Sequence, residues 1–182
     1  MVVVGNCIHQ EVTALCNINK NISVRVFSPH ILERFFNILK SIFRRMPFQV
    51  ALFRSYKSKK YLEYGLGERS IDAVYWITFR VMENIPKFDV PLVIEFVDSM
   101  GLNFKRRAED SMLLRWLYRW EAYTAARYER KCAQIADHGF LVSSIDKEYI
   151  GDDKLHVLPL GVDSTIYKGQ EEEKKSSNES KY

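Results

Sequence analysis

Residues 116–163 read WLYRWEAYTAARYERKCAQIADHGFLVSSIDKEYIGDDKLHVLPLGVD and decide the fold. Apolar residues recur at helical spacing as far as His138, and we expect Gly139 to end this helix in a left-handed conformation. A short apolar run at 140–142 then reads as a strand that ends in two serines. After another helical turn, a second strand leads into Pro-Leu-Gly-Val-Asp at 159–163. Helix and strand therefore alternate.

The upstream segments continue this alternation. Their patterns predict strands at residues 2–4, 22–27, 71–76 and 92–98, and helices at 31–45, 57–66 and from 110 or 111 to 138. Alternation of this kind predicts an α/β fold, namely a Rossmann-like parallel sheet with flanking helices and ligand sites at the carboxyl ends of its strands. We expect the first strand, at 2–4, to be shortened.

The predicted helix at 31–45 is strongly amphipathic. Its polar residues share one side, and its apolar residues lie on the other: Ile31, Leu32, Phe35, Phe36, Leu39, Ile42 and Phe43. A core helix of an α/β domain has this pattern, and so does a basic helix that lies on an anionic membrane surface. Both interpretations remain open at the level of sequence.

Length and composition are those of a globular chain. The 182 residues, 47% of them hydrophobic, fit one domain or half of a two-domain enzyme. We assign residues 1–168 to a single domain and expect the polar tail, 169–182, to be disordered. The formal charge of +4 is a mild basic excess that leaves phospholipid, sugar phosphate and nucleic acid open as anionic partners.

Several classes of protein do not fit the sequence. The three cysteines are far apart and no histidines cluster with them, so we expect no zinc site. No Gly-x-Ser-x-Gly motif points to a hydrolase. The opening residues lack the features of a signal peptide, and no segment has the roughly 20 apolar residues of a spanning helix. We therefore expect a cytoplasmic chain, with a peripheral position at the inner face of the membrane as the alternative.

Polar residues follow two of the predicted strands. Asp98 ends the strand at 92–98, where a carboxylate can act as a base or bind a hydroxyl, although it can equally cap the next turn. Ser143 and Ser144 follow the strand at 140–142 and can meet a phosphate or sugar, or simply cap a helix. Asn103 and Arg106, which follow Asp98, complete the candidate substrate-binding set.

Eight Lys or Arg residues between 105 and 131 are interleaved with aromatic residues, as in some nucleic-acid binders. Helical spacing favours another interpretation, because one stripe of large residues is predicted to be core: Leu113, Leu117, Trp120 and Thr124. Acidic residues in the same stretch dilute its charge. We do not expect nucleic acid as a partner.

The order of these segments resembles the family-4 glycosyltransferases of the two-Rossmann (GT-B) type, particularly bacterial sugar transferases linked to exopolysaccharide export. The resemblance covers residues 20–168. It is carried by VIEFVDS at 93–99, LLRWLYRWEAYTAARYERK at 113–131, FLVSSID at 140–146 and LHVLPLGVDSTIY at 155–167.

This resemblance implies an acceptor-side domain of an enzyme that moves a sugar from a nucleotide diphosphate donor to a glycan or lipid-linked acceptor. It implies retention of anomeric configuration, and catalysis without a metal or other cofactor. Pro159, Gly161, Val162 and Asp163 match the motif beside the interdomain cleft. Asp98 falls near the family's acceptor-side polar residue, so the resemblance makes it a base or a hydroxyl ligand.

Two features depart from the family pattern. The glycine pair of the family's first loop is replaced by residues 2–4 and a lone Gly5. The donor-binding domain with its Glu-x7-Glu pair, which would stabilise the diphosphate leaving group, has no counterpart in the 182 residues. We expect the chain to be inactive or incomplete alone, as a truncated product or one subunit of two. The alternative is a non-catalytic module on the same fold that binds a glycan, a membrane or a protein partner.

Overall fold

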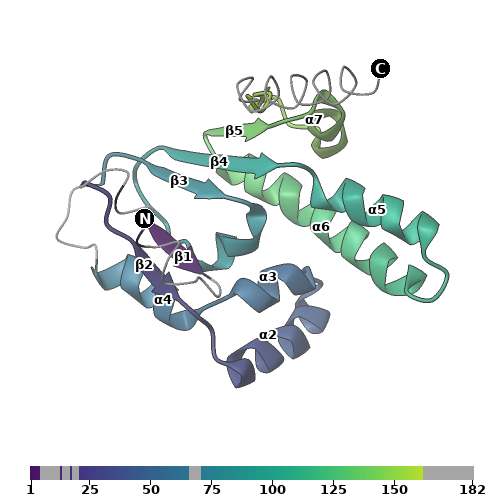
Figure 1. The fold of residues 1–182 in the computed structure, drawn as a ribbon, viewed down its shortest axis with the longest axis horizontal. Helices are drawn as coiled ribbons and strands as arrows, with labels where there is room; N and C mark the ends of the chain where they lie inside the picture. The colour runs from purple at the N-terminus through teal and green to yellow at the C-terminus, as the bar shows by residue number, and fades with distance from the viewer. Residues whose placement is uncertain (5–12, 14–16, 18–20, 66–70, 162–182) are drawn as a thin grey trace, which may run out of the picture.

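The computed structural model of the protein describes residues 1–4, 13, 17, 21–65 and 71–161. In these ranges the chain forms a four-stranded parallel sheet flanked by helices, with a separate pair of short strands (Figure 1). The predicted α/β class and Rossmann-like architecture are confirmed.

The strands of the described ranges fall into two parallel sheets. The smaller sheet pairs β1 (Val2–Val4) with β2 (Arg25–Phe27). The larger has the order β3-β4-β5-β6, formed by β3 (Val74–Ile77), β4 (Leu92–Val97), β5 (His138–Leu141) and β6 (Leu155–Val157). The expected short strand at 2–4 is therefore present, but it pairs with β2 and not with the larger sheet. The near-continuous apolar run of β4 suits its place between two neighbours.

Helices flank the larger sheet (Figure 1). In chain order they are α2 (Ile31–Arg44), α3 (Phe48–Phe53), α4 (Tyr56–Lys60), a π-helical turn η1 (Tyr61–Gly65), a 3-10 helix η2 (Phe79–Asn84), α5 (Met100–Asp110), α6 (Arg115–Ile135) and α7 (Ser144–Ile150). Figure 1 shows α5 and α6 side by side as a hairpin that extends past the sheet. On the other side, α2 packs on α3 and α3 packs on η2, so α2 is the outermost layer.

The core lies where α6 crosses the sheet. The buried face of α6 is made of small residues, such as Ala125, Cys132 and Ala133, which let the helix approach Ile94 and Leu141 closely. Because these side chains are small, α6 lies close to the strands, and the core is densely packed without large leucine side chains on the helix.

The prediction that Gly139 ends the long helix is wrong. The helix stops at Ile135 with Ala136 in an extended conformation, and Gly139 lies inside β5 instead. A Cβ atom on Gly139 would stand 2.4 Å from Leu155 Cδ2 and 3.2 Å from Ile94 Cγ2, so the residue is small because the core presses against it.

The long helix predicted from 110 or 111 to 138 also differs. One shorter helix lies there, because α6 begins only at Arg115 and ends at Ile135, while α5 precedes the predicted range and ends at Asp110. Of the stripe predicted to be core, Thr124 is buried, Leu117 and Trp120 are half-buried, and Leu113 lies exposed in the connection between the helices. Leu113 is not part of a helix, because it lies in the connection between α5 and α6.

The core-helix interpretation of residues 31–45 is wrong. The helix forms as predicted, but its polar side faces the protein: Ser41 is 0% exposed and Asn37 is 8% exposed. Its apolar side faces outward, with Ile31 74% exposed and Phe43 86% exposed. Which side a helix buries depends on its partners, and here α3 and α4 offer backbone groups that polar side chains satisfy.

Some predictions fall outside the described residues. These are the disordered tail at 169–182 and the positions of Val162 and Asp163. Among the helices that are described, none combines the length and apolar character needed to cross a bilayer.

Candidate functional site

The carboxyl end of β4 carries the first part of the candidate site. Asp98 follows the last residue of β4 and is exposed, and the side-chain amide of Asn103, in the first turns of α5, donates a 2.7 Å hydrogen bond to Asp98 Oδ2. Two of the predicted site residues are therefore brought together. An amide that donates to one carboxylate oxygen fixes the group while leaving the other oxygen open to a substrate hydroxyl.

The backbone at this edge is strained at two neighbouring strand ends. Val97 has φ 67°, and Thr78, just after β3, has φ 63° with ψ 146°. The Asp98 N–H donates to Phe96 O at 2.9 Å, which makes Val97 the centre of a three-residue turn. β-branched residues avoid such angles, at a cost of roughly 1–3 kcal/mol each, and strain of this kind is concentrated at functional sites. The turn at Val97 is what directs Asp98 away from the strand.

The first turn of α5 is closed to external anions by a buried carboxylate. Glu129 of α6 accepts hydrogen bonds from Ser99 Oγ at 2.9 Å, Met100 N at 2.6 Å and Gly101 N at 3.3 Å. Burial raises the pKa of the Glu129 carboxyl to about 7, and these hydrogen bonds oppose the rise. Because Glu129 already occupies the N–H groups that a phosphate would need, it serves as an internal anchor for α5.

The other predicted site residues have varied positions. Ser143 follows β5 beside the Asp98 edge, since Val142 N donates to Val97 O at 3.0 Å. Its hydroxyl accepts from Ile145 N at 3.2 Å, which is the ordinary helix-cap role. Four others are exposed: Ser144 at the start of α7, Arg106 on α5, and both Pro159 and Gly161 beyond β6.

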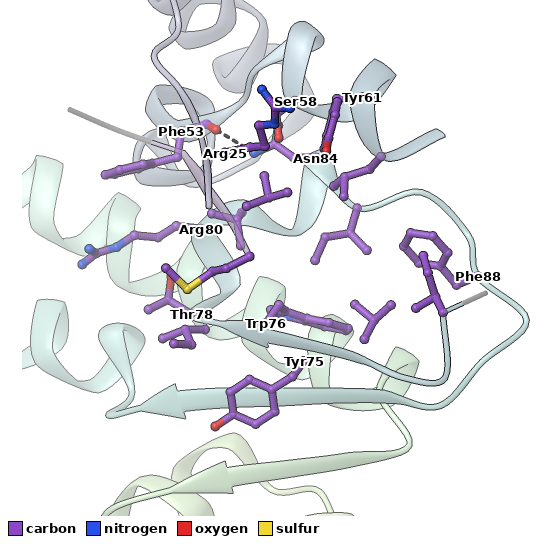
Figure 2. Close-up of a pocket in the computed structure, with 18 of the residues that line it drawn as sticks. Arg25, Phe53, Ser58, Tyr61, Tyr75, Trp76, Thr78, Arg80, Asn84 and Phe88 are labelled. Carbon is purple, nitrogen blue, oxygen red and sulfur yellow. Dashed lines mark hydrogen bonds between the residues drawn. The ribbon is translucent and has the colours of Figure 1, made fainter. Parts of the chain in front are cut away.

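A cavity of about 620 Å³ lies between β3 and the layer formed by β1, β2, α4 and η1. Figure 2 shows Arg25, Ser58, Tyr61 and Asn84 on one side of it, opposite Trp76 and Thr78 of the β3 segment. Most of the wall is apolar. The cavity was not predicted from the sequence, because the residues that line it are spread from Met1 to Phe88.

A few polar groups interrupt the apolar wall. Trp76 is 5% exposed, and within the described part of the chain its indole N–H has no hydrogen-bond partner; the same holds for the Ser58 hydroxyl. Asn84 uses both ends of its amide, since it accepts from Ser55 N at 2.7 Å and donates to Phe53 O at 2.8 Å. A buried N–H without a partner is costly. The cavity therefore suits a mostly apolar molecule that carries hydrogen-bond acceptors.

Arg80 connects the cavity to the Asp98 edge. Its guanidinium lies over the Phe53 ring at 5.8 Å, and its Nη2 contacts Met100 Sδ at 3.6 Å. Met100 is two residues beyond Asp98, so Arg80 both lines the cavity and reaches the start of α5. The cation places positive charge between the two parts of the site.

Sequence reasoning missed the buried carboxylates of α6 and the cavity residues Trp76 and Arg80. For Glu121 and Glu129 a signal was present, because both share the helical stripe of small residues that includes Ala125 and Cys132. A stripe of small residues predicts close packing, and acidic residues within it must be buried. No comparable pattern points to Trp76 or Arg80.

The fold and this edge define a Rossmann-like α/β domain with a polar strand-end site beside an apolar cavity. Comparison with known proteins yields no match: no family model fits the chain, and neither a curated protein nor a solved structure is similar to it. Among the described residues, no group of three or more His, Cys, Asp or Glu side chains is placed to hold a metal ion.

Proposed function

We propose that this chain is an acceptor-side domain of a glycosyltransferase, which acts in the transfer of a sugar from a nucleotide-sugar donor to a glycan or lipid-linked acceptor. The observation that carries the proposal is the carboxylate of Asp98, held by Asn103 at the carboxyl end of an inner parallel strand. The proposal also rests on the sequence resemblance to family-4 glycosyltransferases.

In this proposal Asp98 receives a hydrogen bond from the acceptor hydroxyl and orients it for attack. Asn103 keeps the carboxylate in one rotamer, and the strained turn at Val97 presents it at the carboxyl edge of the sheet. Holding a nucleophile in this way lowers the entropic part of the barrier. The apolar cavity, which Arg80 joins to this edge, has the character to take the lipid part of a lipid-linked acceptor.

Stabilisation of the nucleotide diphosphate leaving group belongs to a donor-binding domain of the same enzyme class. Such stabilisation is usually a large share of catalysis. We therefore expect no transfer by this chain alone, and transfer once a donor-binding domain is supplied.

The test begins with the DNA on both sides of the coding region. A neighbouring donor-binding domain with a Glu-x7-Glu pair would be co-expressed with this chain and assayed with radiolabelled UDP-glucose, UDP-galactose and GDP-mannose on lipid extracts. We expect transfer only in the presence of both parts, and a loss of about 100-fold or more in Asp98→Asn. Transfer by the chain alone, or no donor-binding domain nearby, would contradict the proposal.

The cavity favours a second candidate, a non-catalytic module that binds an apolar ligand. A fluorescent fatty acid is a direct probe, and Trp76→Phe is the informative variant because it retains the ring and removes the N–H. Saturable binding that weakens in Trp76→Phe, combined with no sugar transfer under any condition, would favour the binding module over the enzyme.

A further inference from the structure

Helix α2 presents an apolar face to solvent over its whole length. The face is formed by large side chains that are each between 46% and 86% exposed: Ile31, Leu32, Phe35, Phe36, Leu39, Ile42 and Phe43. Single exposed apolar residues are ordinary on protein surfaces, but a contiguous set of this size marks a contact surface. We call these seven residues the α2 face.

Specific polar contacts fix this orientation of α2. On the opposite side of the helix, Asn37 Nδ2 donates to Arg54 O at 3.0 Å, and Glu33 Oε1 accepts from Tyr56 N at 2.8 Å. Both partners are backbone groups at the ends of α3 and α4. Rotating α2 to bury its apolar side would remove both contacts and leave the part-buried Arg54 carbonyl without a partner, at a cost of about 1–3 kcal/mol.

The charge around the α2 face is concentrated and positive. Residues 31–60 contain eight Lys or Arg residues and one acidic residue, whereas the rest of the chain has nineteen basic and twenty-two acidic residues. Lys40 borders the α2 face and is exposed. The whole basic excess of the protein therefore lies in the segment that carries the exposed apolar helix.

A basic hollow adjoins the carboxyl end of α2. It has a volume of about 370 Å³ and includes four cationic side chains, Arg44, Arg45, Arg127 and Lys131. Only Glu83 among its lining residues is acidic, and it lies 3.7 Å from Arg44. A hollow of this charge is suited to the phosphate of a lipid headgroup.

We propose that the α2 face docks the protein on an anionic phospholipid bilayer. The apolar side chains enter the boundary between headgroups and acyl chains, while the basic residues of 31–60 and the hollow bind headgroup phosphates. Charge complementarity selects lipid over other occupants, because an apolar protein groove would match the α2 face without needing the surrounding basic excess. This proposal does not depend on sugar transfer.

The experiment is flotation of the purified chain with vesicles of phosphatidylcholine alone or mixed with phosphatidylglycerol. We expect binding to the anionic vesicles only. Phe35→Ser/Phe43→Ser should weaken it about tenfold or more, since both rings are exposed and their loss leaves the fold intact. Met112→Ser/Leu113→Ser, which removes apolar residues that are 91% and 86% exposed elsewhere, is the matched control and should bind normally.

A second pair of double variants tests the contribution of the basic residues. Lys40→Gln/Arg45→Gln should weaken binding, whereas Lys87→Gln/Arg119→Gln, with the same charge removed from other exposed sites, should not. Equal loss in the test and control pairs would overturn the proposal. So would a dimer in sedimentation equilibrium that Phe35→Ser/Phe43→Ser dissociates, because a second copy would then cover the α2 face.

Discussion

The Glu121 carboxyl is buried with only one of its oxygens satisfied. Oε1 accepts from Phe48 N at 2.6 Å, whereas Oε2 has no partner among the described residues. Burial raises its pKa from 4.5 to about 7, and the hydrogen bond from Phe48 opposes the rise. In the folded state the proton is thus held more tightly than in the unfolded chain. The ionised form of Glu121 is the destabilising one.

This predicts the direction of one pH effect. Between about pH 4.5 and 7 the folded chain binds more protons, so the free energy of unfolding should fall as pH rises through this window. Glu121→Gln removes that titration and should flatten the profile, with a gain of about 1–2 kcal/mol at pH 8. Urea unfolding between pH 4.5 and 8 measures it. A profile as steep as that of the wild type would contradict the assignment; Glu129 accounts for any smaller residual slope.

Gly139 is buried against Leu155, so adding a side chain there should destabilise the fold. Alanine at this position should lower the free energy of unfolding by about 1–3 kcal/mol, because its Cβ would overlap Leu155 Cδ2, and Leu155 is fully buried, so that its side chain can shift only by disturbing the core around it. Gly161→Ala is the matched control, since nothing lies within 4 Å of the added atom. Thermal unfolding of both variants checks this; equal melting temperatures would show that the core can adapt.

At the scale of elements, α5 depends on α6 for its first turn. Ser99 is fully buried, caps α5 by accepting from Leu102 N at 3.2 Å, and donates to Glu129 at 2.9 Å. Ser99→Ala should cost about 1–3 kcal/mol because it breaks both bonds inside the protein. Ser144→Ala, at an exposed position, should change stability by less than about 0.5 kcal/mol. Denaturant midpoints compare the two, and equal midpoints would rule out the capping role.

The same pair of helices shows how far the sequence could predict the fold. Strong periodicity correctly predicted α2 and most of α6, and β-branched or apolar runs predicted strands whose observed starts differ by up to three residues. Helix α5 was missed because its stability comes from Glu129, a residue 19 or more positions further along the chain that occupies its N–H groups. Periodicity reveals that a helix has two faces, but only the partner decides which is buried, and α2 was misjudged for this reason.

The candidate site was predictable to a similar degree. A carboxylate after a buried strand identified Asp98, whereas its hydrogen bond with Asn103 depends on α5, which was not predicted. The cap role of Ser143 was one of the two alternatives considered. The cavity could not be foreseen, because Trp76, Arg80 and Ser58 belong to β3, η2 and α4, and α4 meets η2 only in the folded chain.

At the scale of the whole molecule, the two proposed sites belong to different layers. The Asp98 edge lies on the four-stranded sheet, whereas the α2 face forms the outermost layer beyond α3 and η2 (Figure 1). A protein docked through α2 would therefore keep the strand ends and the cavity on structure that the bilayer does not cover. The acceptor-side site would therefore stay accessible while the protein is held at the membrane.

The separation of charge along the chain leads to the last prediction. If residues 31–60 provide both attraction and insertion, raising NaCl from about 50 to about 500 mM should weaken binding to anionic vesicles about tenfold or more without abolishing it, because salt screens the cations but not apolar contact. In Phe35→Ser/Phe43→Ser the remaining binding should be purely electrostatic and vanish at high salt. Vesicle flotation across the salt series distinguishes these behaviours. Binding of the wild type that is equally strong at both salt concentrations would show that the basic residues do not contribute. Wild-type binding that is lost completely at high salt would show that the α2 face does not insert.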